Sequence, residues 1–231
     1  MTPSLLLIAC DLEATPAPTF IDGILLPDGS AAEWVEGVDN PWFPLPVGAT
    51  WEYEAALDDG TTESIHIEVL ADPKNVNGVA ATAVYDIGSV DGVTAEETWD
   101  WYAQDSGGNV WYLGEDTCEW EAGACARRMG TWEWGVDGAV PGWIMQADPT
   151  EDGQPYFQEY LDGTAEDVGE VLAIGESITV TAGDYSDCVR TADTSHLDAT
   201  LDEEKTYCAG VGNVFVAEPG GDAVLIKTGG L

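Results

Sequence analysis

The sequence predicts an all-β protein, an antiparallel meander that curls into a barrel or a two-layer sandwich, with at most a short helix. The first observation is period-two alternation: in residues 63–70, ESIHIEVL, the isoleucines and Val69 share one face while His66 and Glu68 lie on the other. The second is a set of Asp-Gly and Gly-Gly turns between such runs. The third is a composition rich in Trp and Gly, with 10 and 27 residues, which suits sheets and tight turns.

An extended entry segment, NPWFPLPVG, opens the ordered part at residues 40–48. Strand-like runs follow at 50–57, 63–72, 78–87, 94–104, 110–121, 124–134, 176–193 and 203–218, with a last hairpin turn at 220–221. Residues 135–172 mix Pro, Gly and carboxylates, which indicates a long excursion around a short strand. The best helix candidate is one or two turns near 164–172.

The chain divides into three parts. Residues 1–10 end in an apolar run before Cys10 and resemble a signal peptide whose cysteine carries a lipid. The run is short and no Lys or Arg precedes it, so we expect a start codon further upstream. Residues 11–40 are Pro/Gly-rich and acidic and predict a tether, with one short ordered piece around Trp34. Residues 41–231 predict a single β domain.

Charge is the outlier of the composition. The chain carries 44 Asp and Glu against six Lys and Arg, a formal net charge of -38. Such a surface repels phosphate backbones, which excludes nucleic acid as a partner, and it also repels anionic lipid head groups. A solvated acidic coat adapted to salt is the simplest interpretation, because dissolved ions screen the self-repulsion.

Four cysteines remain once Cys10 is set aside, an even number that predicts disulfides. If Glu121 and Ala122 form a hairpin loop, Cys118 lies directly opposite Cys125, near bonding distance. Two further strand-like runs carry Cys188 and Cys208, so we predict the pairs 118–125 and 188–208. Stable disulfides need an oxidising compartment, which predicts the bacterial cell envelope or secretion.

Several segments resemble a family of secreted or lipid-anchored bacterial β-rich lipoproteins of undefined function. They are NPWFPLPVGATWEYE, DWYAQDSGGNVWYLGED, GVDGAVPGWIM, QEYLDGTAED and the stretch from Tyr207 to Gly212, and together they span about residues 40–217. Relatives carry Ala-Pro where this chain has Cys208-Ala209, a departure that fits a disulfide peculiar to this chain. The resemblance implies export and a β fold, and it supplies no catalytic residues.

Two sets of side chains are candidate sites. Five tryptophans on neighbouring predicted strands could form a platform for a glycan or an apolar small molecule, or else fill the core between two sheets: Trp99, Trp101, Trp111, Trp132 and Trp134. Asp100 and Glu133 alternate with them, so the face opposite the tryptophans is acidic. Loop carboxylates permit a Ca²⁺ site, although no EF-hand loop is present: Asp148, Glu151, Asp152, Glu159, Asp162 and Glu166.

The sequence favours a non-catalytic cell-envelope protein that binds or contacts a partner. It requires no cofactor, and Arg127, Arg128 and Arg190 are expected to pair with structural carboxylates. Two alternatives stay open: a self-assembling structural surface component, and a glycan-acting hydrolase whose paired carboxylates serve as acid and base.

Overall fold

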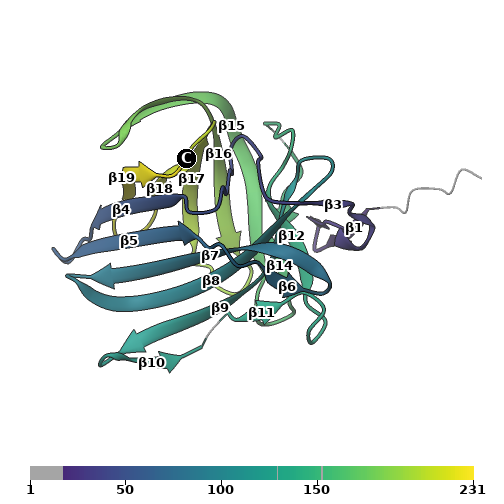
Figure 1. The fold of residues 1–231 in the computed structure, drawn as a ribbon, viewed down its shortest axis with the longest axis horizontal. Helices are drawn as coiled ribbons and strands as arrows, with labels where there is room; N and C mark the ends of the chain where they lie inside the picture. Colours follow the sequence, from purple (N-terminus) through teal and green to yellow (C-terminus); the bar gives the residue numbers. More distant parts are fainter. Residues whose placement is uncertain (1–17, 129, 152) are drawn as a thin grey trace, which may run out of the picture.

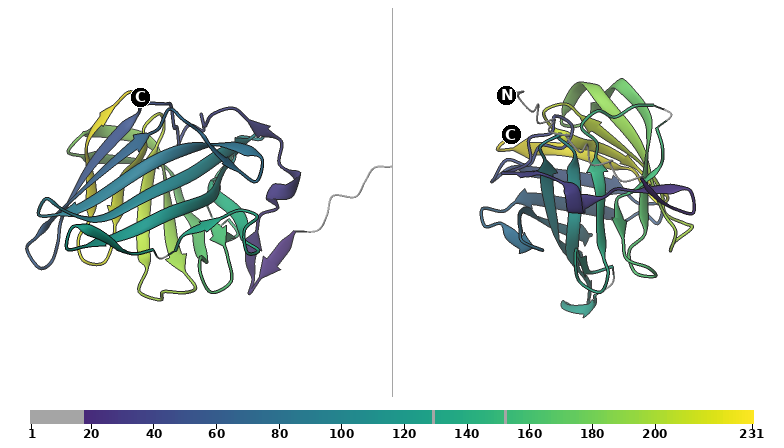
Figure 2. Two further views of the ribbon diagram at one scale, coloured as in Figure 1. Left: turned by 60° about the horizontal axis from the view of Figure 1, so that its bottom comes forward. Right: turned by 90° about the vertical axis from the view of Figure 1, so that its right-hand side faces the viewer.

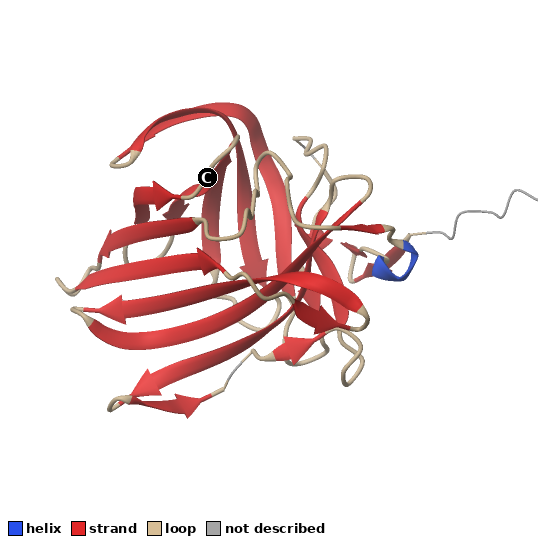
Figure 3. Ribbon diagram, viewed as in Figure 1, coloured by secondary structure: helices blue, strands red, loops and turns tan. Residues whose placement is uncertain are grey.

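The structure is a computed structural model that describes residues 18–128, 130–151 and 153–231. It confirms the all-β prediction, as Figure 3 shows, and the sheet curls strongly without closing into a barrel. The strands are β1 (Thr19–Ile21), β2 (Ile24–Leu26), β3 (Trp34–Val35), β4 (Thr50–Ala56), β5 (Thr62–Val69), β6 (Lys74–Val76), β7 (Val79–Val90), β8 (Val93–Asp105), β9 (Val110–Glu121), β10 (Ala124–Arg127), β11 (Trp132–Glu133), β12 (Val140–Met145), β13 (Tyr156–Phe157), β14 (Glu159–Tyr160), β15 (Asp167–Val180), β16 (Gly183–Ser195), β17 (Asp202–Cys208), β18 (Gly212–Ala217) and β19 (Ala223–Gly229).

Two sets of long strands build the curl. β4, β5, β7, β8 and β9 pair in that order, and β15, β16, β17, β18 and β19 pair in theirs. In Figure 1 the first set runs across the view and the long strands of the second set run steeply past it. The last strand, β19, pairs antiparallel with β4, so the two ends of the β domain meet at one seam. β12 continues the first set beside β9, and β13 extends the second set beside β15.

The segment predicted as a tether is part of the fold wherever it is described. β1 and β2 form a small hairpin, β2 runs parallel to β13, and β3 pairs with β8. A 3₁₀ turn (Gly29–Ala31) between them is the one helical segment of the described residues. Trp34 holds the segment down, because its ring lies 5.8 Å from that of Trp111 and 5.7 Å from that of Trp134. Figure 2 shows this segment against one end of the curl.

The helix predicted near 164–172 is wrong. Leu161 and Ala165 form a β-bridge, and residues 167–180 are the long strand β15, paired along its length with β16. Pairing with β16 and the burial of Val168 and Val171 outweigh the local preference of this carboxylate-rich stretch. None of the described residues forms a helix long and apolar enough to cross a membrane.

The two faces of the β7–β8–β9 layer pack against different neighbours. On the concave face, Val84, Tyr112 and other side chains join the large core inside the curl. On the convex face, Ala83, Trp101 and Leu113 form a second core beneath β6 and the N-terminal segment. This layer is therefore buried on both sides, which explains why tryptophan is frequent in it.

Both predicted disulfides are present in the structure. Cys188 and Cys208 are direct cross-strand partners of β16 and β17, with Cα atoms 4.0 Å apart. Cys118 bonds Cys125 with Cα atoms 5.7 Å apart.

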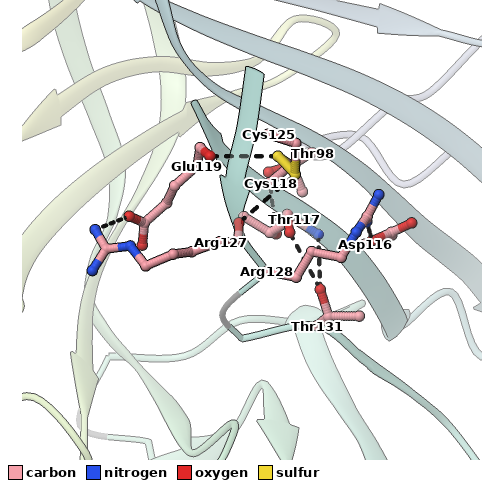
Figure 4. Close-up of a disulfide and its surroundings, with 9 residues drawn as sticks. All are labelled: Thr98, Asp116, Thr117, Cys118, Glu119, Cys125, Arg127, Arg128 and Thr131. Atoms are coloured by element: carbon pink, nitrogen blue, oxygen red, sulfur yellow. Dashed lines mark hydrogen bonds and ion pairs between the residues drawn. A yellow bond between two sulfur atoms is a disulfide. The ribbon is translucent and has the colours of Figure 1, made fainter. Parts of the chain in front are cut away.

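The hairpin of the second bridge is shifted by one residue from the prediction. Its loop is Ala122-Gly123, both with positive φ, and Cys125 pairs with Trp120 rather than with Cys118. A β-bulge just after Cys125 brings the two cysteines together diagonally. Figure 4 shows the surroundings: Arg127 pairs with Glu119, and Arg128 pairs with Asp116. Both ion pairs agree with the structural role predicted for these arginines.

Candidate functional site

A cavity of about 310 Å³ lies inside the curl and is the candidate site. Both strand sets contribute to its wall, since β4, β5, β7 and β8 face β17, β18 and β19 across it. The entry segment adds Phe43, Pro44 and Leu45. Asn40 anchors that segment: its backbone N–H donates to Gln104 Oε1 at 2.8 Å, and its side-chain amide donates to the carbonyl of Gly108 at 3.0 Å.

The wall combines three kinds of side chain. Aliphatic residues form much of it, namely Leu45, Ile65, Ile67, Val84, Ile144, Val216 and Ala223. Aromatic rings come from Phe43, Trp51, Tyr53, Tyr102 and Tyr207. The ionisable groups are Asp86, Asp100, Glu203, Lys205 and Glu218. An apolar cavity with a few convergent polar groups is the usual form of a small-molecule site.

Strand register brings acidic side chains together on the concave face, in what we call the acidic belt: Asp86, Asp100, Glu115 and Glu159. Asp100 on β8 lies directly opposite Glu115 on β9. Like charges directly opposite each other destabilise a sheet, so this pair lowers the stability of the fold when both carboxyls are ionised.

A β-bulge places Glu115 on this face. The β8–β9 register shifts beside Trp101, so Tyr112 and Glu115, three apart in sequence, both point into the curl. Gly114 permits this bend with a φ of +143°, and a Cβ there would lie 2.5 Å from the carbonyl oxygen of Trp132.

The Tyr112 hydroxyl joins the two carboxyls. Its oxygen lies 2.5 Å from Asp100 Oδ1 and 2.7 Å from Glu115 Oε2. A tyrosine hydroxyl has one proton and can donate to only one of them. The other contact needs a proton on the carboxyl, so at least one of the two acids is neutral in this arrangement.

The electrostatics agree with this geometry. Burial raises the pKa of Asp100 to about 6, and the charge of Glu96 acts in the same direction. Burial, together with the charge of Asp100, raises the pKa of Glu115 to about 8. Burial also raises the pKa of Asp86 and of Glu159 well above the ordinary range of a carboxyl. A cluster of acids whose pKa values are raised together is typical of functional sites.

Lys205 is the cation of the cavity wall, and it is already neutralised. Its Nζ lies 2.9 Å from Asp193 Oδ2 and 3.1 Å from Glu203 Oε2. Asp193 is buried and also accepts hydrogen bonds from Thr191 at 2.9 Å and from Gln158 at 3.3 Å. The charges of Asp193 and Glu203 hold the pKa of Lys205 high although its burial acts against them.

The five predicted tryptophans do not lie on one surface. Trp101, Trp111 and Trp132 are buried, the first two in the convex-side core and the third in the core of the curl. Trp99 packs on Tyr85, and Trp134 packs on Trp34. None of the five lines the cavity, whose tryptophan is Trp51.

The carboxylates predicted for calcium are also dispersed. Asp148, Glu151 and Asp162 are exposed, whereas Glu159 is buried in the acidic belt. Glu166 accepts a hydrogen bond from the backbone N–H of Gly163, and Glu151 accepts one from that of Ile174. Among the residues that the structure describes, no three His, Cys, Asp or Glu side chains lie close enough together to hold a metal ion. Asp152 lies outside the described residues.

The sequence held a partial signal for the belt. Asp100 lies between Trp99 and Trp101, so the face opposite the tryptophans was expected to be acidic, and it is the face that carries Asp100 into the cavity. Glu159, which was predicted among the loop carboxylates for calcium, lies in the acidic belt. The partners on β17, β18 and β19 gave no signal, because nothing in the sequence places them opposite β7 and β8.

Comparison with known proteins gives a distant likeness. No family model matches the chain, and no curated protein matches it. A crystal structure described as that of a putative lipoprotein from Parabacteroides distasonis is similar with a TM-score of 0.43 and 12% identity, covering 82% of this chain and 99% of the other. This is too remote to transfer residues or roles. Cys10 and the signal-like residues 1–10 lie outside the described residues.

Proposed function

We propose that this protein is a non-catalytic binding module of the bacterial cell envelope and that it holds a small molecule in the cavity of the curl. The observation that carries the proposal is the cavity of about 310 Å³, whose wall is mainly apolar and aromatic with acids at one side. That volume is at the lower end of known small-molecule sites. The ligand would therefore be compact.

An envelope location is supported by chemistry rather than by the comparison. The structure contains two disulfides in a chain of five cysteines, and disulfides persist in oxidising compartments. A lipid on Cys10 would hold the domain at a membrane despite a charge of -38 that anionic head groups repel. Metabolic labelling with a fatty acid in a bacterial host tests this. Label lost in Cys10→Ala supports the anchor, and no label in the wild type refutes it.

The hydrolase alternative has weaker support. Paired carboxylates act on a glycosidic bond that lies between them. In the pair Asp100 and Glu115, the Tyr112 hydroxyl contacts both carboxyls and occupies the space between them. This arrangement favours binding over acid–base catalysis at the pair.

The cavity is tested with N-phenyl-1-naphthylamine, a neutral dye that fluoresces in apolar surroundings. We expect saturable binding at one site of the wild type. Val216 lines the cavity, so Val216→Trp should weaken binding about tenfold or more by filling it. The matched control is Val93→Trp, because Val93 is 68% exposed at the β7–β8 turn and does not line the cavity.

Circular dichroism and a thermal melt verify that both variants fold. Absence of saturable binding by the wild type, or undiminished binding by folded Val216→Trp, refutes the cavity as a ligand site.

A further inference from the structure

The acids of the cavity wall include groups with no partner in the protein. Register places Asp100 opposite Val84, so Asp86 lies two residues further along the same face of β7. Asp86 makes no hydrogen bond or ion pair with any described residue, and the Tyr112 hydroxyl is the one such partner of Asp100. Both side chains contribute to the cavity wall. A partly buried carboxyl left without partners is costly to the fold when ionised, unless something else compensates its charge.

Aromatic rings lie beside these acids. The ring centroid of Phe43 lies 5.2 Å from that of Tyr102 and 5.9 Å from that of Tyr207, so three rings meet at one part of the wall. Tyr207 is only 3% exposed, it lines the cavity, and its hydroxyl has no hydrogen-bond partner among the described residues. Rings combined with carboxylates are the surroundings that stabilise an organic cation, because the faces of aromatic rings carry negative potential.

The charge balance of the wall selects the sign of the ligand. Four carboxyls line it against one lysine, and that lysine is paired with Asp193 and Glu203. An anionic ligand would meet no free cation on this wall. Beside a neutral ligand the Asp86 carboxyl would favour its protonated form, whereas an ammonium group would stabilise its ionised form and gain an ion pair.

We propose that the ligand is an organic ammonium, an amine or quaternary amine with a compact apolar body. Its cationic head lies against Asp86 and Asp100 among the tyrosine rings, and its body packs on the aliphatic wall formed by residues such as Ile67 and Val84. This inference rests on the proposed function, since it assigns the chemistry of a ligand to the same cavity. It differs from that function in a way an experiment can separate.

The test uses 4-phenylbutylamine and 4-phenylbutan-1-ol, which share one apolar body and differ in a charged or neutral head. Each competes with bound N-phenyl-1-naphthylamine at about pH 8, where an alkylamine remains charged. We expect the amine to displace the dye at a concentration about tenfold or more below that of the alcohol. Asp86→Asn should reduce this preference at least about fivefold, and Asp86→Asn with Asp100→Asn should abolish it while alcohol binding is kept.

Two controls test whether the preference for the amine comes merely from the overall negative charge of the protein. Glu54→Gln removes the same charge from an exposed position of β4 and should leave the preference unchanged. Repeating the titration at about 0.5 M salt screens surface charges, and the preference should persist because a direct ion pair with partly buried carboxyls is screened much less. Loss of the preference in either control would assign it to the surface and overturn the inference.

The remaining outcomes are distinct. If the dye and the alcohol bind but the amine has no advantage, the inference of a cationic ligand is refuted, while the cavity remains a binding site. If the preference survives in the folded double variant, Asp86 and Asp100 are not the recognition groups and the inference fails. If no dye binds, the proposed function fails together with the inference.

Discussion

Replacing Glu115 with glutamine tests whether the stability of the fold depends on protonation of the carboxyls in the acidic belt. The carboxyl is partly buried opposite Asp100, and both contact the Tyr112 hydroxyl. Glutamine has nearly the same shape, cannot ionise, and can keep a hydrogen bond to that hydroxyl. The variant therefore imitates the protonated acid at every pH.

The magnitude follows from the pKa. Folding raises the pKa of Glu115 from 4.5 to about 8, chiefly by burial. Each pKa unit corresponds to about 1.4 kcal/mol, so ionising this group costs the fold about 5 kcal/mol. The sign of the pH dependence follows from the raised pKa, because the folded state binds the proton more tightly than the unfolded state. The stabilisation is therefore complete below about pH 4.5, and it is lost as the pH rises to about 8. Asp100, with its pKa raised to about 6, acts in the same direction over a lower range.

The assay is urea unfolding at several pH values from about 5 to 9. We expect the wild type to lose several kcal/mol of unfolding free energy over this range and Glu115→Gln to lose much less. The two should have similar stability near pH 5, and the variant should be the more stable near pH 9. Glu54→Gln, which removes an exposed carboxylate, is the matched control and should follow the wild type.

Added salt distinguishes the contribution of the acidic belt to stability from that of the exposed carboxylates. At about 1 M salt the screening length is near 3 Å, which suppresses repulsion among exposed carboxylates but not the cost of a buried charge. The difference between wild type and Glu115→Gln should therefore persist. A wild type whose stability rises from pH 5 to 8, or a variant with the same pH slope as the wild type, would refute the reasoning.

Two further predictions concern the scaffold. Replacing both cysteines of the 188–208 bridge with serine should lower the free energy of unfolding in urea by about 3 kcal/mol, against about 2 kcal/mol for the 118–125 bridge. The reason is that the first bridge closes a loop of 20 residues and the second a loop of 7. Equal losses, or a larger loss for the shorter loop, would contradict this. Gly142→Ala should lower the free energy of unfolding by about 2 kcal/mol or more, since its Cβ would lie 2.0 Å from the carbonyl oxygen of Phe157. The control Gly88→Ala should change it by about 1 kcal/mol or less, because its Cβ meets a side-chain oxygen at 3.6 Å. A tolerated Gly142→Ala would contradict the prediction and show that β12 and the strand beside it can move apart.

Local patterns were sufficient for much of the scaffold. Period-two alternation in residues 63–70 identified a strand, and cysteine spacing identified both bridges. The hairpin beside Cys118 was predicted one residue out of register, because two residues with positive φ, Ala122 and Gly123, decide the turn and the sequence alone allowed either pair. The tether prediction allowed one ordered piece around Trp34, and the described part of the segment also pairs with the sheet through β2 and β3. Its partners, like the rings on which Trp34 packs, lie far along the chain, and local composition does not reveal such contacts.

The site depended on long-range register. Asp100 was expected on an acidic face, but the bulge at Gly114 that turns Glu115 toward it involves contacts with Trp132. Glu159 has the same residue type as the exposed loop acids with which it was grouped, and only its place beside β12 buries it.

By itself the sequence determined the secondary structure of most of the chain, its negative charge and its cross-links, because alternation, turn residues and cysteine spacing act over a few residues. The tertiary structure alone decided which face is concave and which carboxyls meet there. The physical reason is the seam between β19 and β4, which joins strands more than 160 residues apart and sets Asp86 and Asp100 across a cavity from Tyr207.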